Sequence, residues 1–114
     1  MTESIGVKLV QVVSPVMPVS LSEAETDNKP YCVYELTVTP YQTKDGIYKY
    51  AGDVTIRLVG NTLDEINTKA DQIVTAIAQG MNSSQYSASL QTRTKNCQEN
   101  IWTIELVFII NQYN

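Results

Sequence analysis

Residues 53–77, DVTIRLVGNTLDEINTKADQIVTAI, change their hydrophobic period at Gly60. Up to Gly60 apolar and polar side chains alternate, as they do in a strand with one buried face. Beyond it, Thr62 and Glu65 have the spacing of a helix capping box. Apolar residues then recur every three or four positions as far as Gly80, which predicts the end of the helix. The predicted apolar stripe consists of Leu63, Ile66, Ala70, Ile73, Val74 and Ile77.

A second strand precedes this stretch and predicts a hairpin. Tyr31–Thr39, YCVYELTVT, places Cys32 and every second residue after it on one side, with polar residues on the other. Pro40 is expected to end this strand, and a turn of more than two residues leads to the return strand, Ile47–Val59. Gly52 is the expected position of a bulge within the return strand.

Two further strands are predicted after the helix. Tyr86–Thr92 is a weak strand candidate with mostly hydrophilic outer positions, and Asn96–Asn100 is the expected turn. Ile101–Ile110, IWTIELVFII, is the most β-prone part of the chain and carries apolar side chains on both faces. Such a strand is either central in a sheet that is covered twice, or covered by another chain.

The order hairpin, crossover helix, hairpin predicts an α+β fold, a two-layer sandwich of one main amphipathic helix on a four-stranded, mainly antiparallel sheet. Thr2–Val13 is compatible with either a helix or a strand. A short N-terminal helix is favoured, although Gly6 and the valines weaken this interpretation. Its apolar face consists of Ile5, Leu9, Val12 and Val13. At 114 residues, the chain 1–114 is expected to form a single domain.

Residues 14–30 hold three of the four prolines and a string of acidic residues, which predicts an extended arm or loop. The arm is expected to fold on its own domain. Its four apolar residues allow two other roles, as a short edge strand or as a contact with a neighbouring subunit. These residues are Val16, Met17, Val19 and Leu21.

Composition excludes several classes of function. The net charge is −4 and the eight basic residues are scattered, which argues against a nucleic-acid groove. The absence of histidine removes the commonest general base and metal ligand, and no cofactor or metal site is predicted. Cys32 and Cys97 are too few for a disulfide scaffold and are expected to be reduced. No apolar run is long enough to span a membrane, and the start MTESIGVKLV lacks the basic residues of a signal peptide.

Carboxylate catalysis remains formally possible, but no pair of catalytic carboxylates is evident. Glu35 and Glu105 lie within apolar strands, on the faces assigned outward, where solvated or ion-paired glutamates are the simpler interpretation. Arg57 is expected to pair across strands with Glu35 or Asp53. The acidic residues of the helix are expected to lie on its solvent-exposed face rather than to bind calcium. The glycines are too isolated to form a phosphate-binding loop. The chain is therefore expected not to be an enzyme.

Tyrosine is the least ordinary feature of the composition, since seven of the nine aromatic residues are tyrosines. Several of them cluster near the tip of the first hairpin, where exposed aromatic side chains suit either a protein interface or an ordinary outer strand. Together with the apolar arm and the last strand they give the candidate interface residues. These are Val16, Met17, Val19, Tyr41, Ile47, Tyr48, Tyr50 and Ile109.

Three segments resemble the tail-completion and head-tail joining proteins of tailed bacteriophages, which include the lambda-like tail terminators and related connector proteins. They are KPYCVYEL at 29–36, DVTIRLVG at 53–60 and TLDEINTKADQIVTAI at 62–77. In this family a Pro-Tyr pair opens the first strand, a long hairpin precedes a helix rich in Glu, Ala and Ile, and a second hairpin follows. The likeness covers Pro30 to about Ile110. Family members begin with a longer and more regular helix than Thr2–Val13.

The resemblance implies a structural, non-enzymatic protein of the phage virion, assembled in the host bacterial cytoplasm. Its partners would be copies of itself, in a homo-oligomeric ring of six or twelve at the head-tail junction, together with other connector and tail-tube proteins. Sheet edges, the arm and the tyrosine-rich hairpin would join the copies. The alternative is a small bacterial or prophage binding module that grips one partner with the aromatic hairpin.

Overall fold

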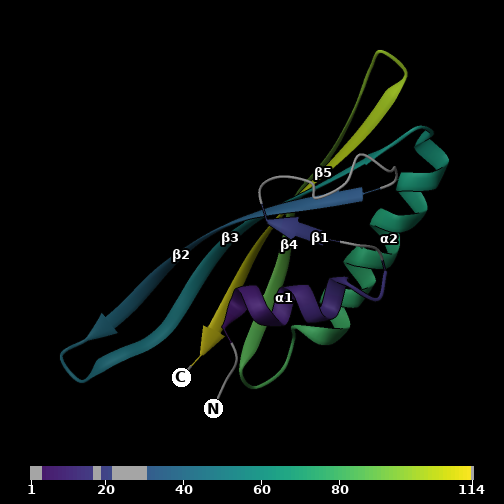
Figure 1. The fold of residues 1–114 in the computed structure, drawn as a ribbon. Coiled ribbons are helices and arrows are strands. Elements are labelled where there is room, and N and C mark those ends of the chain that lie inside the picture. The colour runs from purple at the N-terminus through teal and green to yellow at the C-terminus, as the bar shows by residue number, and fades with distance from the viewer. Residues whose placement is uncertain (1–3, 17–18, 22–30, 114) are drawn as a thin grey trace.

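The computed structural model describes residues 4–16, 19–21 and 31–113, which form one twisted sheet with two helices on one face (Figure 1). The strand order is β1-β2-β3-β5-β4, and every pairing is antiparallel except the parallel pair β1 and β2. The α+β sandwich with four antiparallel strands is therefore confirmed, with a short fifth strand added. The elements in chain order are α1 (Ile5–Val13), β1 (Val19–Leu21), β2 (Tyr31–Thr43), β3 (Gly46–Gly60), α2 (Leu63–Gly80), β4 (Tyr86–Gln98) and β5 (Ile101–Tyr113).

The core lies between the helices and the two central strands, β3 and β5. The alternation predicted for these strands is observed, because every second side chain is buried against the helices. The residues that these strands contribute to the core cluster are Val54, Ile56 and Leu58 on β3, and Ile104, Leu106, Phe108 and Ile110 on β5. From α2 the buried residues Ile66, Ala70, Ile73 and Ile77 complete the predicted stripe. Burial of these branched side chains supplies the main driving force for folding.

The predicted N-terminal helix is present as α1, which buries Ile5, Leu9 and Val13 and contacts both α2 and β5. Two glycines let it approach closely. A Cβ on Gly52 of β3 would lie 3.1 Å from Ile5 Cδ1, and a Cβ on Gly80 of α2 would lie 2.8 Å from Val12 Cγ2. Gly52 pairs regularly with Val38 and Ile110, so the bulge expected there is wrong, and the glycine instead makes room for α1.

The capping signal at the start of α2 is observed. The Thr62 hydroxyl accepts a hydrogen bond from the Glu65 backbone N–H at 3.3 Å, which satisfies one of the free donors of the first turn. Asp64 and Glu65 place negative charge at the positive end of the helix. The helix extends to Gly80, close to the predicted stop.

The first hairpin is longer and tighter than predicted. β2 continues through Pro40 to Thr43. Because β1 pairs only with Cys32–Tyr34, no described strand lies along the outer edge of β2 at Pro40, and the backbone N–H that proline lacks is not required there. The loop contains two residues, Lys44 and Asp45, rather than more. The bulge of this hairpin falls at Tyr48, where the register shifts between Tyr41 and Gln42.

The second hairpin also exceeds the prediction. β4 runs to Gln98, so the expected turn at Asn96–Asn100 shrinks to Glu99 and Asn100. Both residues have positive φ, +54° and +65°, the signature of a two-residue type I′ turn. β5 likewise continues beyond Ile110 to Tyr113.

Part of the predicted arm forms an edge strand. Val19–Leu21 pairs in parallel with Cys32–Tyr34 as β1, which confirms the edge-strand interpretation for these three residues. Val16 is half-buried and packs against the core, while its carbonyl oxygen accepts a hydrogen bond from Lys69 Nζ at 3.2 Å. Met17 and residues 22–30 of the predicted arm lie outside the described part of the chain.

The molecule is elongated, with extents of 53 × 24 × 21 Å. The β2–β3 hairpin and the β4–β5 hairpin project beyond the helices at opposite ends (Figure 1). Each projecting end offers both faces of a two-stranded ribbon to its surroundings.

Candidate interaction surfaces

The outer end of the β2–β3 hairpin carries three of the residues selected from the sequence. Tyr41, Ile47 and Tyr48 are large hydrophobic residues that stay exposed, by 44%, 38% and 47%. The ammonium group of Lys49 lies 4.9 Å from the centre of the Tyr41 ring, a cation–π contact that fixes this ring on the hairpin. The hairpin end is thus an exposed aromatic and apolar surface.

One side of this hairpin continues the apolar face of the core beyond the helices. The register pairs Pro40 with Tyr50 and Gln42 with Ile47, so these residues face the same side as Val38 and as the core residues of β2 and β3. We call Val38, Pro40 and Ile47 the hairpin stripe. Tyr50 is half-buried and packs against the core, so it anchors the base of the stripe.

The sheet face opposite the helices, the bare face, is mostly polar. Threonine, serine and charged side chains occupy most of its positions. On this face Val33 and Val59 are buried, and Tyr41 and Ile101 are exposed. Ile109 and Tyr113 of β5 are each 37% exposed, with half-buried Val107 beside them. We call these three residues the β5 patch. Asp53 of β3 lies next to Ile109 in the register and is exposed.

The eight candidate interface residues therefore do not form one surface. Tyr41, Ile47 and Tyr48 gather at the hairpin end, whereas Ile109 lies on the bare face of the central strand β5. Val16 and Tyr50 pack against the core, and Val19 belongs to β1. Met17 lies outside the described residues.

Sequence reasoning missed Val38 and Tyr113, which are 42% and 37% exposed. Val38 lies on the inward side of an alternating strand, and this pattern predicts burial. Its exposure follows from the position at which α1 stops covering the hairpin, which no local pattern in the sequence records.

Arg57 and Glu105 form an ion pair on the bare face, with 3.5 Å between Arg57 Nη2 and Glu105 Oε2. The pairing expected with Glu35 or Asp53 is wrong, because Glu105 faces Arg57 across the β3–β5 pairing. Both side chains stay more than one third exposed, so the pair contributes little to stability.

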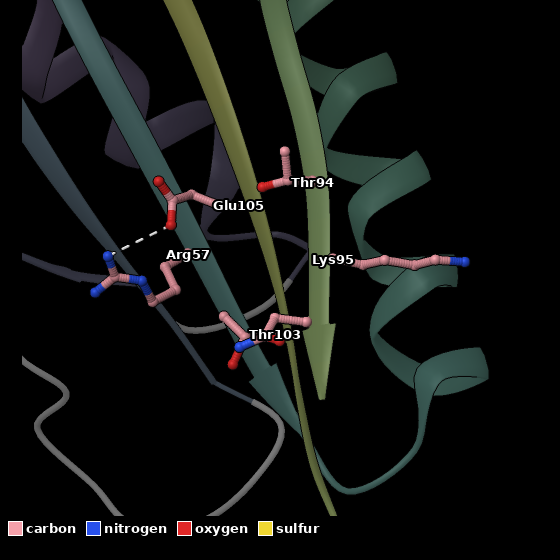
Figure 2. Close-up of a pocket in the computed structure, with 6 residues that line it drawn as sticks. Arg57, Thr94, Lys95, Thr103 and Glu105 are labelled. Atoms are coloured by element: carbon pink, nitrogen blue, oxygen red, sulfur yellow. Dashed lines mark hydrogen bonds and ion pairs between the residues drawn. The ribbon is translucent and has the colours of Figure 1, made fainter. Parts of the chain in front are cut away.

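The same ion pair lines an open pocket of about 250 Å³ on the bare face (Figure 2). Thr94 and Thr103 complete its polar wall, whereas the side chain of Lys95 points away from it towards α2. Glu35, the other candidate carboxylate, does not line this pocket and is exposed on β2. The structure therefore does not bring the two strand glutamates together.

A second charged cluster joins β4 to α2. Arg93 donates hydrogen bonds to Asp71 Oδ1 at 2.8 Å and to Asn67 Oδ1 at 2.6 Å. This bridge tethers the base of the β4–β5 hairpin to the helix. Within residues 4–16, 19–21 and 31–113, no group of three or more Cys, Asp or Glu residues lies close enough to hold a metal ion.

The two cysteines lie in contrasting environments. Cys32 is buried in the core, and burial raises the pKa of its thiol to about 12. Cys97 is exposed near the end of β4, and neither cysteine forms a disulfide bond. Neither of the described helices has the length and apolarity needed to cross a membrane.

Comparison with solved structures finds proteins to which this chain is similar. A chain from the virion of a native gene transfer agent particle matches with a TM-score of 0.58 and 13% identity, over 99% of this chain and 87% of that chain. The bacteriophage SPP1 gp17 protein gives a TM-score of 0.47 and 17% identity, over 93% of this chain and 78% of that one. A protein from Akkermansia muciniphila gives 0.45 and 9% identity, and this chain spans 46% of its length. No family model and no curated protein matches the sequence.

At 13% identity, the gene transfer agent match establishes a shared fold across nearly the whole of both chains. Function does not follow from fold alone.

Proposed function

We propose that this protein is a non-enzymatic structural component of a phage-type virion, and that it assembles with copies of itself into a ring at the junction of head and tail. The observation that carries the proposal is the shared fold with a virion chain over 99% of this chain. The resemblance of three sequence segments to head-tail joining proteins points the same way. A ring of six or twelve copies, in contact with connector and tail-tube proteins, is the assembly that this resemblance implies.

The surfaces of the molecule support a role in assembly. The exposed apolar residues of the β2–β3 hairpin would favour aggregation in a chain that acts alone, and such exposed patches usually mark interaction sites. A ring also suits a small acidic chain, because burying surface between copies adds stability that a core of this size supplies only in part.

Native mass spectrometry and negative-stain electron microscopy of the purified chain test this proposal. A closed ring with one defined number of copies is the expected result. A chain that remains monomeric at high protein concentration, also in the presence of connector and tail-tube proteins, would overturn it. A monomer that instead captures one unrelated protein through the hairpin would favour the alternative of a small binding module.

A further inference from the structure

We infer that the hairpin stripe of one copy packs on the β5 patch of the next copy, with Lys44 of the first beside Asp53 of the second. The inference rests on the proposed self-assembly and adds the contact that produces it. The two surfaces consist of Val38, Pro40 and Ile47 on one side, and of Val107, Ile109 and Tyr113 on the other.

The two surfaces lie on opposite faces of the sheet. The hairpin stripe shares the side of the buried core residues, whereas Ile109 shares the face of Asp53 and Arg57, away from both helices. A single molecule cannot bring the opposite faces of one ribbon together. A second copy can, and the first copy then still presents its unused patch while the second presents its unused stripe.

Two different surfaces can meet reciprocally in a two-fold dimer, or successively in a head-to-tail assembly. The proposed ring requires the head-to-tail contact, with the stripe of each copy on the patch of the next. Head-to-tail contacts close into a ring when the rotation between copies divides a full turn, and otherwise they extend into a filament. The geometry thus connects the exposed hairpin to the proposed ring.

The β5 patch is the best receptor among the exposed apolar residues of the described chain. Val7, Leu90 and Ile101 are exposed on three separate elements, α1, β4 and the start of β5. Ile109 and Tyr113 share one flat face with Val107 between the neighbouring strands β3 and β4. A flat apolar area with a polar rim is the usual composition of a protein interface.

Charge complementarity selects the partners at the rim of this contact. Most basic side chains of the described sheet and helices already have a partner. Arg57 pairs with Glu105, Arg93 with Asp71, Lys69 with the Val16 carbonyl and Lys49 with the Tyr41 ring. Among the described residues, no such contact involves Lys44 at the hairpin loop or Asp53 beside Ile109. In the described part of the chain, Lys8 on α1 and Lys95 at the opposite hairpin also have no such contact, but they lie away from both surfaces. Lys44 therefore provides a cation at the stripe, and Asp53 provides a carboxylate at the patch.

Charge reversal tests this contact in solution. Sedimentation velocity would measure assembly of the wild type, of Lys44→Glu, of Asp53→Lys and of the chain with both changes. Each single change should weaken the contact between copies by about tenfold or more, because it opposes two like charges. The double change should restore assembly, since the introduced glutamate of one copy then meets the introduced lysine of the next. Lys95→Glu, at the opposite hairpin, is the control and should assemble as the wild type does.

Substitution of the apolar residues gives a second, independent readout. Val38→Ser and Ile109→Ser should each abolish the ring and leave a folded monomer, as judged by circular dichroism. Val7→Ser, an exposed valine outside both surfaces, should leave the ring intact. If the wild type forms rings and none of these variants differs from it, this contact is wrong and the proposed ring stands. If the wild type itself never assembles, the proposed function fails as well.

Discussion

Gly80 lies where α1 packs so closely on α2 that there is no room for a side chain. Alanine normally stabilises a helical position by about 1 kcal/mol relative to glycine. At Gly80, however, an added Cβ would lie 2.8 Å from Val12 Cγ2 and 3.3 Å from Val12 Cγ1, and a β-branched side chain on a packed helix has little freedom to move away. We therefore expect Gly80→Ala to destabilise the protein by about 1–3 kcal/mol, measured by urea denaturation.

The double variant identifies the cause. Val12→Ala removes the two methyl groups that Gly80→Ala would strike, so the two changes together should cost less than the sum of the single ones. A Gly80→Ala protein that is as stable as the wild type would contradict the close packing of α1 on α2.

Cys32 makes stability depend on pH at the alkaline end. Burial raises the pKa of its thiol from 9.0 to about 12, so the unfolded chain loses this proton at a lower pH than the folded chain does. The contribution is fully present below pH 9.0 and is lost as the pH rises towards 12. One such group changes the free energy of unfolding by at most about 1.4 kcal/mol per pH unit.

Comparison with Cys32→Ala isolates this effect from the titration of tyrosines and lysines. The wild type should lose stability more steeply with rising pH than Cys32→Ala, and Cys97→Ser should follow the wild type. A thiol reagent at neutral pH should modify Cys97 alone in the native protein. Equal modification of both thiols would show that Cys32 is not sealed in the core.

At the scale of elements, the turn between β4 and β5 is a site for stabilisation. Glu99 and Asn100 both adopt positive φ, a conformation that costs most side chains about 1 kcal/mol and that Asn-Gly adopts readily. Glu99→Asn together with Asn100→Gly should therefore stabilise the hairpin by about 1 kcal/mol in urea denaturation. Gly46→Ala, at a position with φ of +118° in the other hairpin, should act in the opposite direction. An unchanged midpoint in both variants would contradict these turn conformations.

The element types were predictable because each core segment carries its own period. The alternation around Ile56 and the three- and four-residue spacing around Ile73 are local, and burial in the structure follows both. The capping residues Thr62 and Glu65 located the start of α2 within one residue. The type of each core strand and core helix can thus be predicted from its local hydrophobic period.

The ends of the hairpins were not predictable in the same way. Arg93, Lys95 and Gln98 lie in a strand with almost no apolar residues, and only the register with β5 makes them β-structure. Pro40 stops a central strand but not one with an open edge, and the order of the strands decides which case applies. The hairpin stripe was missed for a related reason, since the exposure of Val38 depends on how far α1, whose first residue Ile5 lies beside Gly52, extends along the hairpin.

At the scale of the whole molecule, the β2–β3 hairpin separates stability from assembly. Residues 42–48 extend beyond the last described pair of β3 with β5, Lys49 with Tyr113, and do not belong to the core cluster. Replacing 42–48 by Asn-Gly would connect Tyr41 and Lys49, which already face each other, through a two-residue turn.

This shortened chain should keep the melting temperature of the wild type within a few degrees and should lose the ability to form rings. Calorimetry and native mass spectrometry would measure the two properties on one sample. A large drop in melting temperature would show that the hairpin end supports the fold, and retained rings would exclude it from the contact between copies.

The position of β5 at the centre of the sheet has a consequence for biosynthesis. β5, the last of the described strands in chain order, lies between β3 and β4, and the first helix, α1, also contacts it. A nascent chain on the ribosome therefore lacks the strand that joins its two hairpins until translation has passed Tyr113. The same strand supplies Ile109, so an unfinished polypeptide has neither a closed core nor a receptor for a neighbour. Folding of the core therefore has to wait for the synthesis of β5.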